Sequence, residues 1–189
     1  NLIIQADTAM YQAKEAGRGR VHFFSSALEK QRQENQNIER QLKAAIANNR
    51  LQLYYQPKVM LDKDGMRYES AEALLRWIDN GKVVFTPDQF IAIAEQTNLI
   101  CELGYWVSHT ACVQMSVWAS EGLNHFKVAI NLSPRQLRDE KLYDYLLKTI
   151  TTFGIAAEQL ELEITEHAVI ENIQQSIKTL VKLKTLGIT

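Results

Sequence analysis

The stretch MRYESAEALLRW, residues 66–77, decides the predicted fold because it predicts a strand and carries charged side chains in an otherwise apolar run. Successive residues of a strand point to opposite faces, so Glu72, Leu74 and Arg76 share one face. A carboxylate and a guanidinium on one face of an otherwise apolar run are unusual. We therefore expect this strand to belong to a sheet, and Glu72 and Arg76 are candidate functional residues.

Further strands and helices alternate around this stretch. Strands are predicted at 51–59, 126–133 and 160–165, and helices at 86–98, 101–121, 139–153 and 168–186. Strands separated by helices predict a parallel α/β architecture. A complete (β/α)₈ barrel needs about 250 residues. Residues 50–189 supply four predicted strands, so a small open sheet and about half of a barrel both stay open at this point.

The N-terminal region differs from the rest of the chain in its pattern of apolar and polar residues. Residues 1–24 predict a helix that ends at Gly17, followed by a short strand at 21–24. Residues 25–49 contain neither Gly nor Pro, and their first part is polar on all sides. Such a pattern is typical of a solvent-exposed helix between domains. We expect a connecting helix that spans roughly 30 Å and docks on the next domain through its C-terminal half.

Composition narrows the class of protein. The chain has 189 residues, 46% of them hydrophobic, and a net charge of −1, which gives no reason to expect a nucleic-acid polymer as partner. No apolar run approaches the length of a membrane span. Cys101 and Cys112 are too far apart in one predicted helix to form a disulfide, which suits a reducing compartment. We expect a cytoplasmic location, with any membrane anchor in a missing upstream region.

Three predicted strand ends offer oxygen ligands, namely Glu72, Asn131 and Glu163. Sites of α/β sheets and barrels lie at the C-terminal ends of strands, and oxygen-only ligation suits Mg²⁺ or Mn²⁺. Simpler interpretations stay open. Glu161 and Glu163 are also typical of a solvated strand face, Arg76 could pair with Glu72, and Asn131 could serve turn chemistry before Ser133 and Pro134.

The motif AEALLRW at residues 71–77 is similar to the signature of the EAL domain family, whose pattern is Glu-x-Leu-x-Arg. Four further stretches resemble motifs of this family, in the family's order. They are YYQPKV at 54–59, TPDQFIAIAEQTNLI at 86–100, AINLSPRQL at 129–137 and LELEITEHAVI at 160–170. The resemblance covers about residues 40–189. It implies a TIM-like (β/α)₈ barrel, of which residues 50–189 form about the first half.

The resemblance also implies a reaction, the hydrolysis of cyclic-di-GMP to pGpG with two divalent metal ions, Mg²⁺ or Mn²⁺. Matched position by position, Glu72, Asn131 and Glu163 are metal ligands, and Glu72 is a catalytic residue. Substrate would be held by Gln56, Leu74 and Arg76. Glu166 matches a glutamate that positions the family's active-site loop.

Residues 1–24 resemble the C-terminal end of a GGDEF diguanylate cyclase domain through ADTAMYQAKEAGRGRVHFF. Lys14 and Arg18 match phosphate contacts of that family and are expected to be vestigial here. The predicted organisation is therefore a GGDEF remnant at 1–24, a linker helix at 25–49 and the N-terminal part of an EAL domain at 50–189.

The family places an Asp-Asp pair in a DDFGTG-like motif on the next strand, for which the last three residues, GIT at 187–189, resemble the lead-in. The pair itself is absent from these residues, so we expect the parent protein to be the phosphodiesterase and this chain to be inactive. The alternatives are a cyclic-di-GMP receptor, or a structural half-barrel that associates with another chain, including a homodimer through the EAL domain or the open barrel edge.

Overall fold

The structure is a computed structural model that describes residues 2–15, 17, 21, 25–63, 65–164 and 173–189. The chain divides into two compact units, residues 1–42 and 43–189. Each unit is described by itself. The division of the chain into a GGDEF remnant, a linker and an EAL part stays a prediction.

The N-terminal unit is helical. Helix α1 (Leu2–Glu15) is followed by Gly17, which has φ of +99° and donates from its backbone N to Lys14 O at 3.3 Å. This left-handed conformation agrees with the predicted helix end. Helix α2 (Ser26–Ala47) runs from this unit into the next, and Ser25 caps its start by accepting from Leu28 N. The predicted strand at 21–24 falls largely outside the described residues.

The second unit is built on a sheet with the strand order β1-β2-β4-β5, to which β3 adds by pairing with β2. The strands are β1 (Leu51–Asp62), β2 (Gly65–Asp79), β3 (Lys82–Phe85), β4 (Lys127–Leu132) and β5 (Leu160–Ile164). Strand β4 is parallel to both β2 and β5. The sheet therefore has a parallel centre, as expected for part of a (β/α)₈ barrel.

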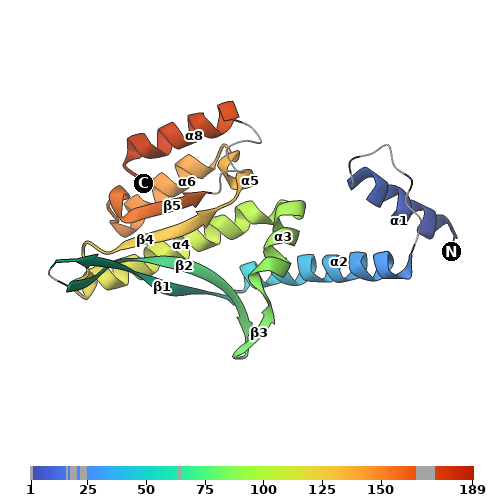
Figure 1. Cartoon of the computed structure of the whole chain (residues 1–189), viewed down its shortest axis with the longest axis horizontal. Helices are drawn as coiled ribbons and strands as arrows, with labels where there is room; N and C mark the ends of the chain where they lie inside the picture. The colour runs from blue at the N-terminus through green and yellow to red at the C-terminus, as the bar shows by residue number, and fades with distance from the viewer. Residues whose placement is uncertain (1, 16, 18–20, 22–24, 64, 165–172) are drawn as a thin grey trace. The chain divides into compact units, whose positions relative to one another are not determined.

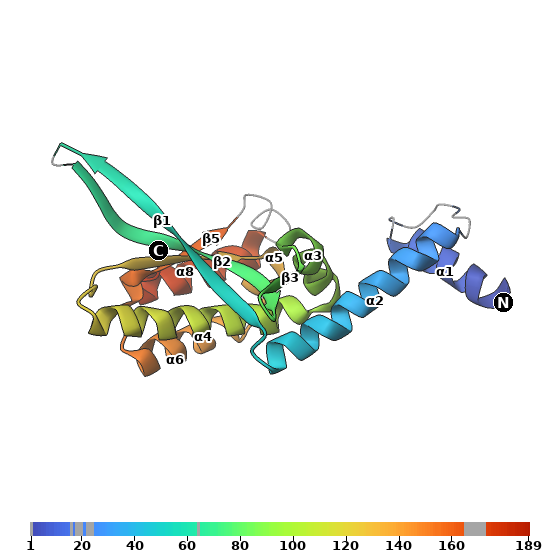
Figure 2. The ribbon, with the colours of Figure 1, turned by 90° about the horizontal axis from the view of Figure 1, so that it is seen from below.

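The prediction that all strands run parallel is wrong for the first pair. Strands β1 and β2 are antiparallel, with Gln56 opposite Glu72. The physical reason is the connection between them, which leaves only residues 63–64 between the strands. A parallel pair requires a crossover of a dozen or more residues, so this short connection permits a hairpin only. Figure 2 shows the far end of this hairpin extending beyond the other strands.

Strand β3 was not predicted. It forms a hairpin with β2 through Asn80 and Gly81, which both have positive φ, +50° and +74°. Asn-Gly is the preferred pair for a two-residue type I′ hairpin turn. The sequence itself therefore carries the signal for this hairpin.

The remaining chain forms helices. These are α3 (Pro87–Thr97), α4 (Leu99–Ser120), the short α5 (Pro134–Leu137), α6 (Leu142–Phe153), a 3₁₀ turn (Ala157–Gln159) and α8 (Ile173–Leu186). The predicted helices are confirmed where the structure describes them, with Pro87 at the first position of α3. Residues 168–172 of the last predicted helix lie outside the described residues. No helix in the described part of the chain is both long and apolar enough to cross a membrane.

The core lies between the helices and one face of the sheet (Figure 1). Val128, Ile130 and Leu132 of β4 are buried there together with residues of α4 and α6, among them Cys112 and Leu146. Because alternate residues point the other way, the second face carries the polar side chains of the same strands. We call this second face, which bears Glu72, Asn131 and Glu163, the open face.

The end of the described chain continues the sheet. Thr189 donates from its backbone N to Leu160 O at 3.3 Å and accepts from Leu162 N at 2.7 Å. Both bonds involve β5, whose other edge pairs with β4. The predicted role of residues 187–189 as the approach to a further strand is therefore consistent with their hydrogen bonds.

Candidate functional site

The sheet register brings the predicted site residues to neighbouring positions on the open face. Glu72 is the partner of Gln56 on one side and of Ala129 on the other, and Asn131 is the partner of Glu163. Partners in a register share a face, so Glu72 of β2, Asn131 of β4 and Glu163 of β5 form one cluster. Asn131 Nδ2 donates to Glu72 Oε1 at 2.7 Å. Glu72, Asn131 and Glu163 are thus brought together as predicted.

The turn after β4 is stabilised by Ser133 and Gln136 and not by Asn131. Ser133 and Gln136 form a capping box, in which Gln136 Oε1 accepts from Ser133 N at 2.8 Å and Ser133 Oγ accepts from Gln136 N at 3.3 Å. This box starts α5 immediately after the strand. The side chain of Asn131 is therefore left for the open face, and the turn interpretation of Asn131 is wrong.

A fourth residue of the cluster, Lys58 of β1, was missed by the sequence reasoning. Lys58 Nζ lies 2.5 Å from Glu163 Oε1 and 3.7 Å from Glu161 Oε2. The hydrogen bond to Glu163 raises the pKa of Lys58, with partial burial acting in the opposite direction and Glu161 and Glu72 adding to the rise. The alternation rule could have found it, because Lys58 is two residues from Gln56 in the same strand.

The simpler interpretation, that Glu161 and Glu163 form a solvated strand face, does not hold. Glu161 lies 3.7 Å from Lys127 Nζ as well as from Lys58 Nζ, so each carboxylate of β5 has a lysine from another strand. Within the described residues, no three His, Cys, Asp or Glu side chains converge as a ready metal site. The cation that these carboxylates share in this structure is an ammonium group.

Arg76 does not pair with Glu72. Its Nη1 donates to the backbone O of Leu75 at 2.9 Å, and its guanidinium carbon lies 5.9 Å from the ring centroid of Tyr54. Both contacts keep the guanidinium on β1 and β2, next to the cluster. A guanidinium held by one backbone carbonyl and an aromatic ring retains donors for an anionic ligand.

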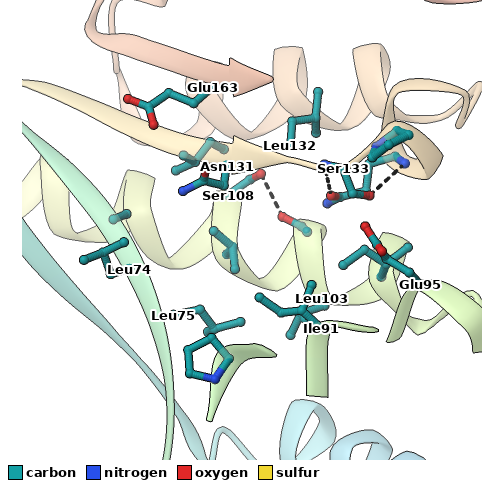
Figure 3. A pocket seen from close by; sticks show the side chains of 18 of the residues that line it. Leu74, Leu75, Ile91, Glu95, Leu103, Ser108, Asn131, Leu132, Ser133 and Glu163 are labelled. Atoms are coloured by element: carbon teal, nitrogen blue, oxygen red, sulfur yellow. Dashed lines mark hydrogen bonds between the residues drawn. The ribbon is translucent and has the colours of Figure 1, made fainter. Parts of the chain in front are cut away.

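A pocket of about 380 Å³ adjoins the cluster at the C-terminal ends of β2 and β4. Figure 3 shows Leu74, Asn131 and Glu163 at this pocket, with Ile91 and Leu103 contributed by α3 and α4. Arg76 also lines it, whereas Glu72 and Gln56 do not. A largely apolar pocket with a few polar groups at its rim is typical of a small-molecule site.

Of the three further predicted residues, only Lys14 is among those that the structure describes. Lys14 lies exposed at the end of α1. Arg18 and Glu166 lie outside the described residues. The loop-positioning role of Glu166 and the vestigial phosphate contacts therefore stay predictions.

Comparison with known proteins identifies the family of the chain. The EAL domain family matches residues 39–189, which is most of the chain. The chain therefore belongs to the EAL domain family, and its sheet with a parallel centre is part of a TIM-like barrel. The predicted fold class is confirmed at this level.

The relatives include proteins named as cyclic di-GMP phosphodiesterases. The chain is 35% identical over 187 residues, 99% of its length, to the bifunctional diguanylate cyclase/cyclic di-GMP phosphodiesterase MucR of Pseudomonas aeruginosa, and covers 27% of that protein. It is 33% identical over 186 residues, 98% of its length, to the cyclic di-GMP phosphodiesterase PdeR of Escherichia coli, and covers 28% of it. The chain thus spans about a quarter of the length of these relatives.

A solved structure shares the fold and the family. The MucR phosphodiesterase in complex with c-di-GMP superposes with a TM-score of 0.73 at 32% identity, over 80% of this chain and 61% of that one. That complex shows that a related EAL domain binds the dinucleotide.

Proposed function

We propose that the open-face cluster and its adjoining pocket are the cation- and substrate-binding part of a cyclic-di-GMP phosphodiesterase site, which hydrolyses cyclic-di-GMP to pGpG in the parent protein. One observation carries the proposal. Three oxygen-bearing side chains, Glu72, Asn131 and Glu163, occupy neighbouring register positions on three adjacent strands beside a pocket large enough for a nucleobase. Membership of the EAL family and its named phosphodiesterases support it.

The residues present fit a divalent cation. Two carboxylates and a carboxamide are the hard oxygen donors that Mg²⁺ and Mn²⁺ prefer. Two interactions in the structure occupy the same atoms, the Asn131 bond to Glu72 and the Lys58 ammonium on Glu163. The ammonium is a stand-in cation at the carboxylates. A divalent cation supplies Lewis-acid activation of water and neutralisation of the phosphodiester charge.

Three further residues of the chain would bind the substrate. Arg76 would exchange its bond to Leu75 O for charge-assisted bonds to a phosphate oxygen, since its guanidinium already lies at the pocket. Gln56, opposite Glu72, offers an amide donor and acceptor to the substrate. Leu74 supplies apolar surface to a base.

Residues 1–24 are proposed to be the end of a GGDEF cyclase domain. The match to the bifunctional cyclase and phosphodiesterase of Pseudomonas aeruginosa extends over 99% of this chain and so includes most of this segment. We assign no activity to it, because the signature loop of that domain is absent from the 189 residues.

The test is a titration of the 189-residue chain with Mn²⁺ and with cyclic-di-GMP, combined with a chromatographic search for pGpG. We expect Mn²⁺-dependent binding of cyclic-di-GMP and little or no pGpG, because the Asp-Asp pair implied by the resemblance is not among these residues. Glu72→Gln should lose Mn²⁺ binding. Glu69→Gln, an exposed carboxylate of the same strand, is the matched control and should keep it.

The outcomes separate the candidate functions. Cyclic-di-GMP binding that needs no Mn²⁺ would favour the receptor alternative. Absence of binding together with a concentration-dependent mass in light scattering would favour a structural half-barrel that associates with a second chain. Efficient release of pGpG would contradict the expected inactivity of this chain and strengthen the assignment as a hydrolase.

A further inference from the structure

Lys58 is a residue of the open face to which the proposed function gives no task. It lies on β1 opposite Ser70, and its ammonium contacts Glu163 at 2.5 Å. The two side chains are 39% and 38% exposed, so the ion pair is accessible to solvent on one side. A second carboxylate, Glu161, lies 3.7 Å from the same ammonium.

A second lysine gives a close comparison. Lys127 of β4 is the partner of Ser70 from the other side, so Lys58 and Lys127 flank the same residue on the same face. Lys127 Nζ also lies 3.7 Å from Glu161, by way of the other carboxylate oxygen. Among the ion pairs of the described residues, Lys58 bonds to Glu163 and Lys127 does not.

This arrangement makes Lys58 a competitor for a divalent cation at Glu163. Neighbouring carboxylates repel one another unless a cation lies between them. In this structure the cation at Glu163 is the Lys58 ammonium, which is bonded to Oε1. Cation binding at Glu163 therefore requires Lys58 to leave it, and Glu161 offers the ammonium an alternative partner within reach.

We propose that Lys58 is a positioning residue that holds Glu163 in the metal-free protein and moves to Glu161 when a divalent cation binds Glu163. The inference rests on the proposed role of Glu163 as a metal ligand. In addition, the Lys58 ammonium is a counter-cation within the site. It keeps the carboxylates ordered and lowers their affinity for a divalent cation. Glu161 then serves as the partner of Lys58 in the loaded protein.

The test compares Mn²⁺ binding by calorimetry in wild-type protein, Lys58→Met and the matched control Lys127→Met. Both variants remove one positive charge from the same face and one neighbour of Glu161. We expect Lys58→Met to bind Mn²⁺ about two- to fivefold more tightly than Lys127→Met, the range expected from the loss of a partly exposed ion pair. Lys58→Arg retains the cation and should stay close to wild type.

A thermal readout separates competition from a merely structural role. Without Mn²⁺, Lys58→Met should melt at a lower temperature than Lys127→Met, because Glu163 loses its partner. Saturating Mn²⁺ should raise the melting temperature of Lys58→Met by more than it raises that of wild type. If Lys58→Met is destabilised equally with and without Mn²⁺, Lys58 has a structural role only and the inference is wrong.

The role of Glu161 is tested by a double-mutant cycle. In a Glu161→Gln background Lys58 has only Glu163 as carboxylate partner, so the Lys58→Met substitution should tighten Mn²⁺ binding more than it does with Glu161 present. The general effect of removing a carboxylate cancels in the cycle. Equal effects in the two backgrounds would contradict the transfer to Glu161.

Failure of this inference is distinguishable from failure of the proposed function. Mn²⁺ binding by wild-type protein with equal affinities in Lys58→Met and Lys127→Met would overturn the inference and leave the metal site standing. Mn²⁺ binding by Lys58→Met that is weaker than wild type would also overturn it. No Mn²⁺ binding by wild type or by any of the variants would overturn both.

Discussion

Asn131 and Glu72 are 59 residues apart in the sequence and are joined by a hydrogen bond of 2.7 Å from Asn131 Nδ2 to Glu72 Oε1. The bond connects β4 to β2, the two parallel strands at the centre of the sheet. It holds the carboxylate of Glu72, part of the EAL signature, against the side-chain amide of Asn131 in the neighbouring strand. Because the bond uses Nδ2, the carboxamide oxygen of Asn131 stays available as a metal ligand while the amide orients Glu72.

Replacement of Asn131 by Ala should weaken Mn²⁺ binding by about tenfold or more, because it removes one oxygen donor and the group that orients Glu72. The cost in free energy of unfolding should be small, about 1 kcal/mol or less, since the bond lies on an exposed part of the sheet. Calorimetric titration and urea denaturation measure the two effects separately. Gln52→Ala, an exposed amide of β1, is the control. A tenfold loss in Gln52→Ala as well would show that any polar loss on this sheet disturbs the site.

Gly104 of α4 is required by the capping residue that follows Asn131. A Cβ at position 104 would lie 1.6 Å from Gln136 Nε2, and Gln136 is 95% buried with its Oε1 on Ser133 N. Gly104→Ala should therefore displace Gln136 and destabilise the protein by about 1–3 kcal/mol, the usual cost of overpacking.

The double variant gives the control for that prediction. In a Gln136→Ala background the clash is gone, so Gly104→Ala should cost much less there, and alanine's better helix propensity should favour it by several tenths of a kcal/mol. Urea denaturation of the four proteins measures the coupling. Additive effects would mean that Gly104 and Gln136 do not meet as the structure describes.

These contacts mark the limit of what the sequence alone could predict. The alternation rule correctly placed Glu72 and Arg76 on one face of β2 and Glu161 and Glu163 on one face of β5, because strand periodicity is local. It could not supply the register between strands, which depends on tertiary packing. The hydrogen bond from Asn131 to Glu72 and the proximity of Lys58 to Glu163 both depend on that register.

Two errors had readable causes in the chain. The antiparallel pairing of β1 with β2 follows from a connection too short for a crossover, and β3 follows from Asn80-Gly81. Both features follow from turn signals, which the alternation of helices and strands does not include. The close contact between Gly104 and Gln136 had no local signal, since it joins two helices whose packing the pattern does not specify.

Arg76 provides a test of substrate binding that is independent of cation binding. Arg76→Lys keeps the charge and removes the planar fork of donors, so cyclic-di-GMP should bind about tenfold more weakly while Mn²⁺ affinity stays unchanged. Fluorescence or calorimetric titration with each ligand measures this. Lys82→Met, which removes an exposed cation of β3, should leave both affinities unchanged. A parallel loss of Mn²⁺ affinity in Arg76→Lys would show that Arg76 supports the metal ligands instead of the substrate.

The cysteines should differ in reactivity although they share helix α4. Cys112 is fully buried, and burial raises its pKa to about 12, so at pH 8 only about one thiol in 10⁴ is ionised. Cys101 is half-buried, and burial followed by the charge of Asp139 raises its pKa as well. In native protein at pH 8, iodoacetamide should label Cys101 slowly and Cys112 only through unfolding.

The variant Cys101→Ala isolates the second thiol. Its labelling rate should rise with urea in step with the unfolding transition, since the buried thiol is protected by the core between α4 and β4. Mass spectrometry of the alkylated protein measures the rate. Fast labelling of Cys112 in native Cys101→Ala would contradict the packing of α4 on the sheet. No disulfide should form under oxidation, because 11 residues of helix separate the two α-carbons by roughly 16 Å, well beyond the span of a disulfide.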